Sequence, residues 1–265
     1  MGGAERAERR RRQQAAQAAR VAQGSTPTAG APGSAGRSKA GVARVAIGVL
    51  VVLVVGGGIW LQTRGNSGEL PAAVPVVQPA ADYPVQARGD VVVAGDPQAP
   101  VTIDVYEDFL CPICGAFEDE YGDRLTRAAA SGAATVRYHP VAILDGLSDP
   151  SGYSTLAAAT ALCAADAGVF PAVHESLFAT QPAEGGTGWT QGQLLQLGRD
   201  LGAGADFTRC LREDGAQRVV AATQQARLDV SGPQGLGTLT VLVNGEVADL
   251  GDRDWLDDAL GTSGG

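Results

Sequence analysis

Hydrophobic and polar positions follow two kinds of pattern from Asp90 onward. Short β-branched runs at 91–93 and 101–106 (VTIDVY) predict strands. Directly after Cys111 and Pro112, apolar residues recur every four positions and predict the buried face of a helix. They are Ile113, Phe117, Tyr121 and Leu125. The chain is therefore expected to pass from a strand into a helix at the cysteines.

A run of predicted helices separates this region from a later β segment. Apolar residues follow helical spacing along six stretches, the last of which closes the chain: 153–167, 169–179, 190–201, 205–213, 216–228 and 254–260. Further strands are predicted at 135–143, 239–243 and 246–249. Asn244-Gly245 joins the last two, and this dipeptide is typical of tight β-hairpins. The order of elements predicts an α/β protein.

The most apolar stretch of the chain lies nearer the N-terminus. Residues 45–61 (VAIGVLVVLVVGGGIWL) carry no charge, and a helix counted from Val42 would span about 30 Å, the thickness of a hydrocarbon core. A cleaved signal peptide is the alternative, since 45–55 would suit its apolar region. An uncleaved, single-pass transmembrane helix at 42–62 is favoured, because no convincing small-residue cleavage site follows closely.

Charge divides the chain around this stretch. Residues 1–61 carry nine basic and two acidic side chains, and the rest carries eleven basic and twenty-seven acidic ones. The basic residues precede the expected span, which predicts a cytoplasmic N-terminus and an extracytoplasmic body in the cell membrane. The acidic body makes nucleic acid an unsuitable partner. Residues 1–40 are expected to be disordered and to contact membrane lipid, and the proline-rich residues 63–88 to form an extended stalk.

Two of the four cysteines, Cys111 and Cys114, form a Cys-Pro-Ile-Cys motif on the exported side, where an oxidising compartment favours disulfides. Pro112 suits the first position of a helix, which places Cys111 at the helix N-terminus. Free N–H groups there stabilise a thiolate, so Cys111 is predicted to attack and Cys114 to resolve mixed disulfides. Zinc binding or an inert structural disulfide are the alternatives. No metal and no cofactor are expected.

The other two cysteines, Cys163 and Cys210, lie on predicted amphipathic helices. A structural disulfide that joins these helices is the simplest interpretation, and it would stabilise the fold by a few kcal/mol. Two buried free thiols, or a second pair that exchanges with Cys111 and Cys114, are the alternatives.

Several other polar residues are candidates for a role near the cysteines. Asp104 is expected to be solvated, with a buried proton carrier as the alternative. His139 is expected at a strand end and His174 on a helix surface, with a catalytic role as the alternative for both. Glu107 and Asp108 would raise the pKa of Cys111 if they lay close to it.

A set of short motifs runs through the chain: DPQAP at 96–100, VTIDVYEDFLCPIC at 101–114, Phe117, and a Gly-Thr-x-Thr loop at 237–240 before Val243-Asn244-Gly245. Together they resemble the DsbA-like branch of the thioredoxin superfamily, over about residues 89–262. The resemblance implies a thioredoxin fold with an α-helical domain inserted at about 146–228. It also implies an enzyme that makes or rearranges disulfides in exported proteins, and a redox partner that recycles its cysteines.

One position departs from the family pattern. The substrate-binding loop of the family has a cis-proline where this chain has Leu239, after Thr238. A cis bond before a non-proline residue costs about 3 to 4 kcal/mol, so a trans bond and a remodelled loop are expected. A non-catalytic adaptor or a copper carrier on a thioredoxin frame is therefore the alternative function. No dimerisation module separates the expected span from the body, which favours a monomeric oxidase.

Overall fold

The computed structural model describes residues 70–230 and 235–262. Its six strands form one sheet in the order β1-β2-β4-β3-β5-β6. β3 and β4 are parallel, and the other neighbouring strands are antiparallel. The strands are β1 Val85–Arg88, β2 Val91–Ala94, β3 Val101–Glu107, β4 Ala134–Pro140, β5 Thr240–Val243 and β6 Glu246–Val247.

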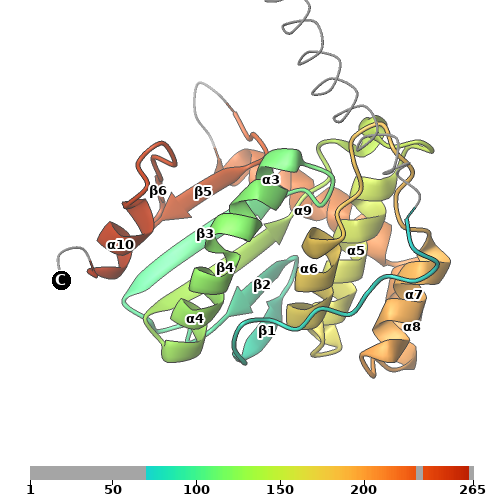
Figure 1. Cartoon of the computed structure of the whole chain (residues 1–265), viewed down its shortest axis with the longest axis horizontal. Helices are drawn as coiled ribbons and strands as arrows, with labels where there is room; N and C mark the ends of the chain where they lie inside the picture. Colours follow the sequence, from blue (N-terminus) through green and yellow to red (C-terminus); the bar gives the residue numbers. More distant parts are fainter. Residues whose placement is uncertain (1–69, 231–234, 263–265) are drawn as a thin grey trace, which may run out of the picture. The chain divides into compact units, whose positions relative to one another are not determined.

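Eight α-helices are described, together with a π-helical segment, η1, and a short 3-10 turn, η2. Figure 1 shows α4 in front of the sheet and α9 behind it, and both contact β4. β3 is buried from Ile103 to Glu107 because the sheet is covered in this way on both faces. The helical segments are α3 Pro112–Phe117, η1 Glu118–Gly122, α4 Asp123–Ser131, η2 Asp145–Leu147, α5 Tyr153–Asp166, α6 Phe170–Ala179, α7 Gln191–Asp200, α8 Ala205–Glu213, α9 Gly215–Asp229 and α10 Trp255–Leu260.

The topology is that of a thioredoxin fold with a helical insertion, as expected. β3 and β4 are connected through α3, η1 and α4, and β5, β6 and α10 complete the fold. Helices α5 to α9 lie between β4 and β5 in the sequence. α5 contacts β1 and β2, and α7 and α8 lie on the side of α5 and α6 away from these strands in Figure 1. The predicted β5–β6 hairpin is confirmed, and its turn residues Asn244 and Gly245 have φ values of 51° and 88°, a left-handed conformation that these residue types tolerate.

The predicted apolar face of the active-site helix is only partly correct. Phe117 and Leu125 are buried, but Ile113 is 63% exposed. Four residues turn an α-helix about 40° beyond one full turn, so a series with this spacing drifts off a single face. Cys114 occupies the inward position beside Ile113 and is fully buried.

Residues 70–84, which were expected to belong to a free stalk, lie against the domain instead. Val74 is 4% exposed, and the backbone N–H of Val77 donates to Ser176 Oγ at 2.9 Å. The side chain of Gln193 donates to the carbonyl oxygens of Pro71 and Ala72, both at 3.2 Å. Burial of Val74 makes this segment part of the domain, and the strand β1 within the expected stalk region was not predicted.

The expected transmembrane helix at 42–62 and the N-terminal segment 1–40 lie outside the described residues. Among residues 70–230 and 235–262, no helix has both the length and the apolar character needed to cross a bilayer.

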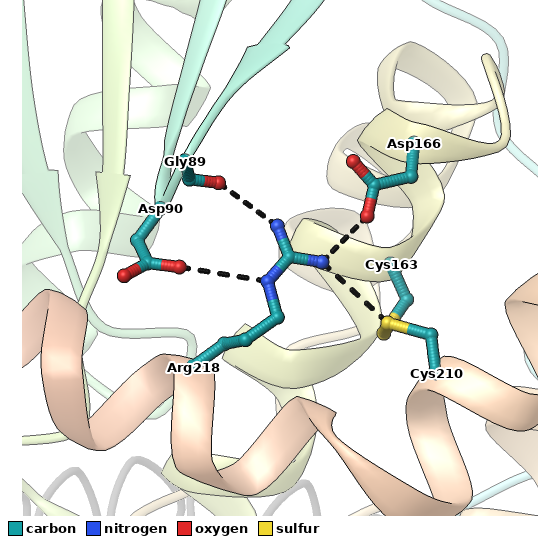
Figure 2. A network of polar contacts seen from close by, with 6 residues as sticks. All are labelled: Gly89, Asp90, Cys163, Asp166, Cys210 and Arg218. Atoms are coloured by element: carbon teal, nitrogen blue, oxygen red, sulfur yellow. Dashed lines mark hydrogen bonds and ion pairs between the residues drawn. A yellow bond between two sulfur atoms is a disulfide. The ribbon is translucent and has the colours of Figure 1, made fainter.

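Arg218 of α9 connects the sheet to the inserted helices (Figure 2). Its guanidinium donates to the carbonyl oxygen of Gly89 at 2.9 Å and to Asp90 at 3.5 Å, in the turn between β1 and β2. It also pairs with Asp166 of α5 at 2.5 Å. One partly buried side chain therefore holds three segments that are distant in the sequence.

Candidate active site

Cys111 and Cys114 of the Cys-Pro-Ile-Cys motif lie where β3 leads into α3. Cys111 is the N-cap of α3 in an extended conformation, and Pro112 follows at the first helical position. The predicted placement of Cys111 at a helix N-terminus is confirmed. Cys111 and Cys114 are both free thiols. Cys111 is 3% exposed and Cys114 is fully buried, so only Cys111 offers any surface to an attacking or leaving sulfur.

Thr238, on the loop before β5, contacts both cysteines. Its hydroxyl oxygen lies 3.0 Å from the Cys114 sulfur. Its carbonyl oxygen lies 3.5 Å from the Cys111 sulfur and can accept a hydrogen bond from the thiol. The loop therefore forms one wall of the cysteine site.

The Thr238–Leu239 peptide bond is cis, so the expected trans bond was wrong. The expected displacement of the loop is not seen either, because Thr238 reaches both sulfurs and Leu239 packs against the hydrophobic core. A peptide bond before leucine prefers the trans form when only the local chain acts on it. Packing of the loop against the cysteines and the core is a tertiary property that this preference does not contain.

The two thiols have different electrostatic surroundings. A hydrogen bond from Cys114 lowers the pKa of Cys111 to about 6, helped by the backbone N–H groups of Cys114 and Ile113 and by the Thr238 side chain, although burial acts in the opposite direction. The hydrogen bond to Cys111 and burial raise the pKa of Cys114 above its usual range. In the reduced pair, Cys111 therefore carries the negative charge and Cys114 keeps its proton.

The Asp108 carboxylate is a buried support for the turn before Cys111. It accepts hydrogen bonds from the N–H groups of Leu110, Ile143 and Leu144 at 2.8 to 2.9 Å and from the Ser154 hydroxyl at 2.7 Å. Four donors of this kind satisfy a carboxylate fully. Asp108 thus fixes the loop that presents Cys111, a role different from the expected electrostatic one.

Gln181, in the loop after α6, was not identified from the sequence. Its side-chain amide donates to the carbonyl oxygens of Phe109 at 3.2 Å and Cys111 at 3.0 Å. These carbonyls lie in the turn that enters α3, so Gln181 holds this turn from the helical insertion. A single glutamine 70 residues after Cys111 gives no sequence signal of such a contact.

The expectations for Asp104 and the two histidines were partly wrong. Asp104 is 5% exposed and pairs with His139 at 2.8 Å and with Arg137 at 3.0 Å. His139 does lie at the end of β4. His174 lies inside the protein, 3% exposed, because the apolar face of α6 includes it, and it pairs with Glu107 at 2.8 Å. None of these groups has a hydrogen bond to either active-site sulfur among the described contacts.

Cys163 and Cys210 are joined by a disulfide between α5 and α8. Cys163 is fully buried. The Cys210 sulfur lies 3.5 Å from a guanidinium nitrogen of Arg218 (Figure 2). The bond lies within the helical insertion and links helices that the sequence separates by 47 residues.

Residues 87–260 match the family model Thioredoxin_4, whose description is thioredoxin. The crystal structure of reduced DsbA from Mycobacterium tuberculosis is similar over 69% of this chain and all of that chain, with 28% sequence identity and a TM-score of 0.51. The reduced disulfide bond oxidoreductase DsbG from the same organism gives 29% identity over 69% of this chain and 94% of its own, also with a TM-score of 0.51.

A curated relative is the serine/threonine-protein kinase PknE of Mycobacterium tuberculosis H37Rv. It is 31% identical over 204 residues, which cover 74% of this chain and 36% of PknE. The chain therefore spans about a third of the length of this relative.

Proposed function

Because the chain belongs to the thioredoxin family, as a DsbA-like thiol-disulfide oxidoreductase, we propose that it forms or exchanges disulfides in exported proteins through Cys111 and Cys114. The observation that supports this assignment is the asymmetry of the two thiols. The pKa of Cys111 is lowered to about 6, and Cys114 is fully buried with a raised pKa. A thiolate at Cys111 is the nucleophile and leaving group that disulfide exchange requires.

The proposed reaction begins with a disulfide between Cys111 and Cys114. A substrate thiolate attacks the Cys111 sulfur, the disulfide breaks, and Cys114 leaves with the electron pair and takes up a proton. A second substrate thiolate then attacks the substrate sulfur of the mixed disulfide and releases Cys111 as a thiolate. The substrate loses two electrons and the cysteine pair gains them, so a redox partner must reoxidise the pair.

The lowered pKa of Cys111 favours this direction. A thiol of low pKa is the better leaving group, so release of Cys111 completes substrate oxidation readily. Cys114 can reverse the first step. Its attack on the Cys111 sulfur of the mixed disulfide would restore the Cys111–Cys114 disulfide and release the substrate as a thiol. Thr238 supports both steps by its contacts with the two sulfurs.

We place the catalytic domain, about 89–262 with its insertion at about 146–228, outside the cytoplasm, tethered by a transmembrane helix at 42–62. The absence of charge in residues 45–61 and the basic residues before them support this placement. Resistance of the full chain to alkaline extraction from membranes, with residues 89–262 accessible to external protease, is the expected result. A protein released by alkali would contradict the tether.

A non-catalytic adaptor or a copper carrier receives less support. That alternative was motivated by a displaced loop at Leu239, whereas Thr238 contacts both cysteines.

Trapping of mixed disulfides tests the proposal. Replacement of the resolving thiol in Cys114→Ser should let Cys111 accumulate covalent adducts with exported proteins, which run as slow bands on non-reducing gels and disappear on reduction. Cys111→Ser is the matched control and should give no adducts. If a folded Cys114→Ser protein forms no adducts in cells, the proposed role of the pair is wrong.

A further inference from the structure

A second group of side chains, separate from the cysteine sulfurs, lies inside the protein. It consists of Glu107 at the end of β3, Glu118 at the start of η1 and His174 of α6. One ligand atom from each of these residues lies within 4.8 Å of the other two. Glu107 is fully buried and His174 is 3% exposed, whereas Glu118 is partly exposed.

The carboxyl groups of Glu107 and Glu118 interact with each other, and each keeps one buried oxygen without any other partner. Glu107 uses one oxygen to bind Nε2 of His174, at 2.8 Å. Its second oxygen, Oε2, is buried without a hydrogen-bond partner, and so is Oε1 of Glu118. Among the described residues, no arginine pairs with either carboxylate, and the protein's one lysine, Lys39, lies outside them.

The imidazole of His174 is held rigidly by aromatic rings. Ring centroids of Tyr138, Phe178, Phe170 and Phe109 lie 4.6, 5.0, 5.1 and 5.8 Å from that of His174. The imidazole is therefore fixed with its Nε2 directed at the Glu107 carboxyl group, as an oriented ligand is in a metal site.

We propose that Glu107, Glu118 and His174 form a binding site for a divalent transition-metal cation of the zinc type. On binding the ion, the two carboxyl groups would lose their protons and supply two negative charges, and the neutral imidazole would supply a nitrogen donor, a set that suits zinc or manganese. Tetrahedral zinc places its ligand atoms about 3.3 Å apart, so small side-chain rotations within the present 4.8 Å limit would complete the site. Glu118 is the least buried of the three residues, and a water molecule would supply the fourth ligand.

The proposed site lies close in sequence to the two cysteines at the start of α3. Glu107 precedes Cys111 by four residues, and Glu118 follows Cys114 by four. A bound cation would therefore tie the end of β3 and the start of η1 to α6, on both sides of the Cys-Pro-Ile-Cys segment. Binding to the native state alone would also stabilise the fold.

Zinc titration of the full chain tests the proposal. The protein is free of any affinity tag and stripped with a chelator, and it carries Cys111→Ser and Cys114→Ser, so that no thiolate of this pair can bind the ion. Isothermal titration calorimetry should give one zinc equivalent. In the same background, Glu118→Gln should weaken the affinity by about 100-fold or more, whereas Glu120→Gln, an exposed change on the same segment, should leave it unchanged.

Two further measurements show whether the variant is folded and which ligand atoms hold the ion. Circular dichroism should show that Glu118→Gln folds, since glutamine has nearly the same shape as the protonated glutamic acid that burial favours at this position. The Co²⁺-loaded protein should show the visible bands of nitrogen and oxygen ligation without sulfur charge transfer. Absence of zinc binding, or equal affinity in folded Glu118→Gln, would overturn the site and leave two buried carboxyls that share a proton.

Discussion

The hydroxyl oxygen of Thr238 lies 3.0 Å from the sulfur of Cys114. The carbonyl oxygen of the same residue lies 3.5 Å from the sulfur of Cys111. The two residues of the first contact are 124 positions apart in the sequence. The loop before β5 therefore helps to set the surroundings of both thiols, together with the N-terminus of α3.

Loss of the Thr238 hydroxyl should raise the pKa of Cys111. The side chain of Thr238 is among the groups that lower this pKa to about 6, and a hydrogen bond of this kind is worth about one pKa unit. Thr238→Val keeps the shape of the side chain and removes the donor. The pH dependence of thiolate absorbance in the reduced protein measures the change.

Thr240→Val is the matched control for this experiment. It removes a hydroxyl at the first residue of β5, where Thr240 donates to the Gly237 carbonyl oxygen at 2.8 Å and has no hydrogen bond to a cysteine. Its Cys111 pKa should stay at the wild-type value. Equal shifts in both variants would mean that loop geometry, and not the Thr238 hydroxyl, controls the thiol.

The stability of the reduced protein should depend on pH through Cys111. Its pKa falls from 9.0, the ordinary value, to about 6 in the folded state. Folding therefore favours the thiolate, and this contribution is fully present above about pH 9 and is lost as the pH falls through about 6. In urea unfolding, the free energy of unfolding of the reduced wild type should increase relative to that of Cys111→Ser as the pH rises from about 6 to about 9. A difference that is constant or shrinks as the pH rises would refute the assignment.

The sequence pattern was sufficient for those parts of the fold that depend on local spacing. Helical periodicity predicted α5 at 153–167, close to the observed Tyr153–Asp166, and Asn244-Gly245 predicted the hairpin. Pro112 predicted that Cys111 lies at a helix N-terminus, since proline favours the first helical position, where backbone N–H groups have no partner in the helix.

The remainder of the site depends on contacts between distant segments. Gln181 reaches the Cys111 carbonyl and His174 reaches Glu107 only because the helical insertion packs against the end of β3. Val74 was assigned to a stalk because prolines surround it, whereas its burial depends on a surface formed by later residues. No local pattern contains this information.

Gln181→Met should destabilise the turn that carries Cys111. Methionine keeps the length of the side chain but leaves the carbonyl oxygens of Phe109 and Cys111 without this donor, which should cost about 1 to 3 kcal/mol in the free energy of unfolding. Chemical denaturation measures the loss. Gln224→Met, an exposed change on α9, should alter stability by less than about 0.5 kcal/mol. Similar losses in the two variants would show that the Gln181 contacts contribute nothing specific.

Arg218→Met should weaken the connection between the sheet and the helical insertion. The aliphatic part of the side chain is kept, while the bonds to Gly89, Asp90 and Asp166 are lost. We expect a loss of about 1 to 3 kcal/mol in the free energy of unfolding. Arg227→Met on the same helix is exposed and serves as the control. An unchanged stability in Arg218→Met would mean that water replaces these contacts at no cost.

Removal of the Cys163–Cys210 disulfide should lower stability without changing the active site. The bond closes a loop with a sequence separation of 47, for which the restricted unfolded chain gives about 4 kcal/mol. The double variant Cys163→Ala/Cys210→Ala should therefore unfold at lower denaturant concentration than the wild type. Its Cys111 pKa should be unchanged, because the groups that lower this pKa all belong to α3 and the Thr238 loop. A reduced rate of substrate oxidation in a folded double variant, with the Cys111 pKa unchanged, would instead favour a pair that exchanges with Cys111 and Cys114.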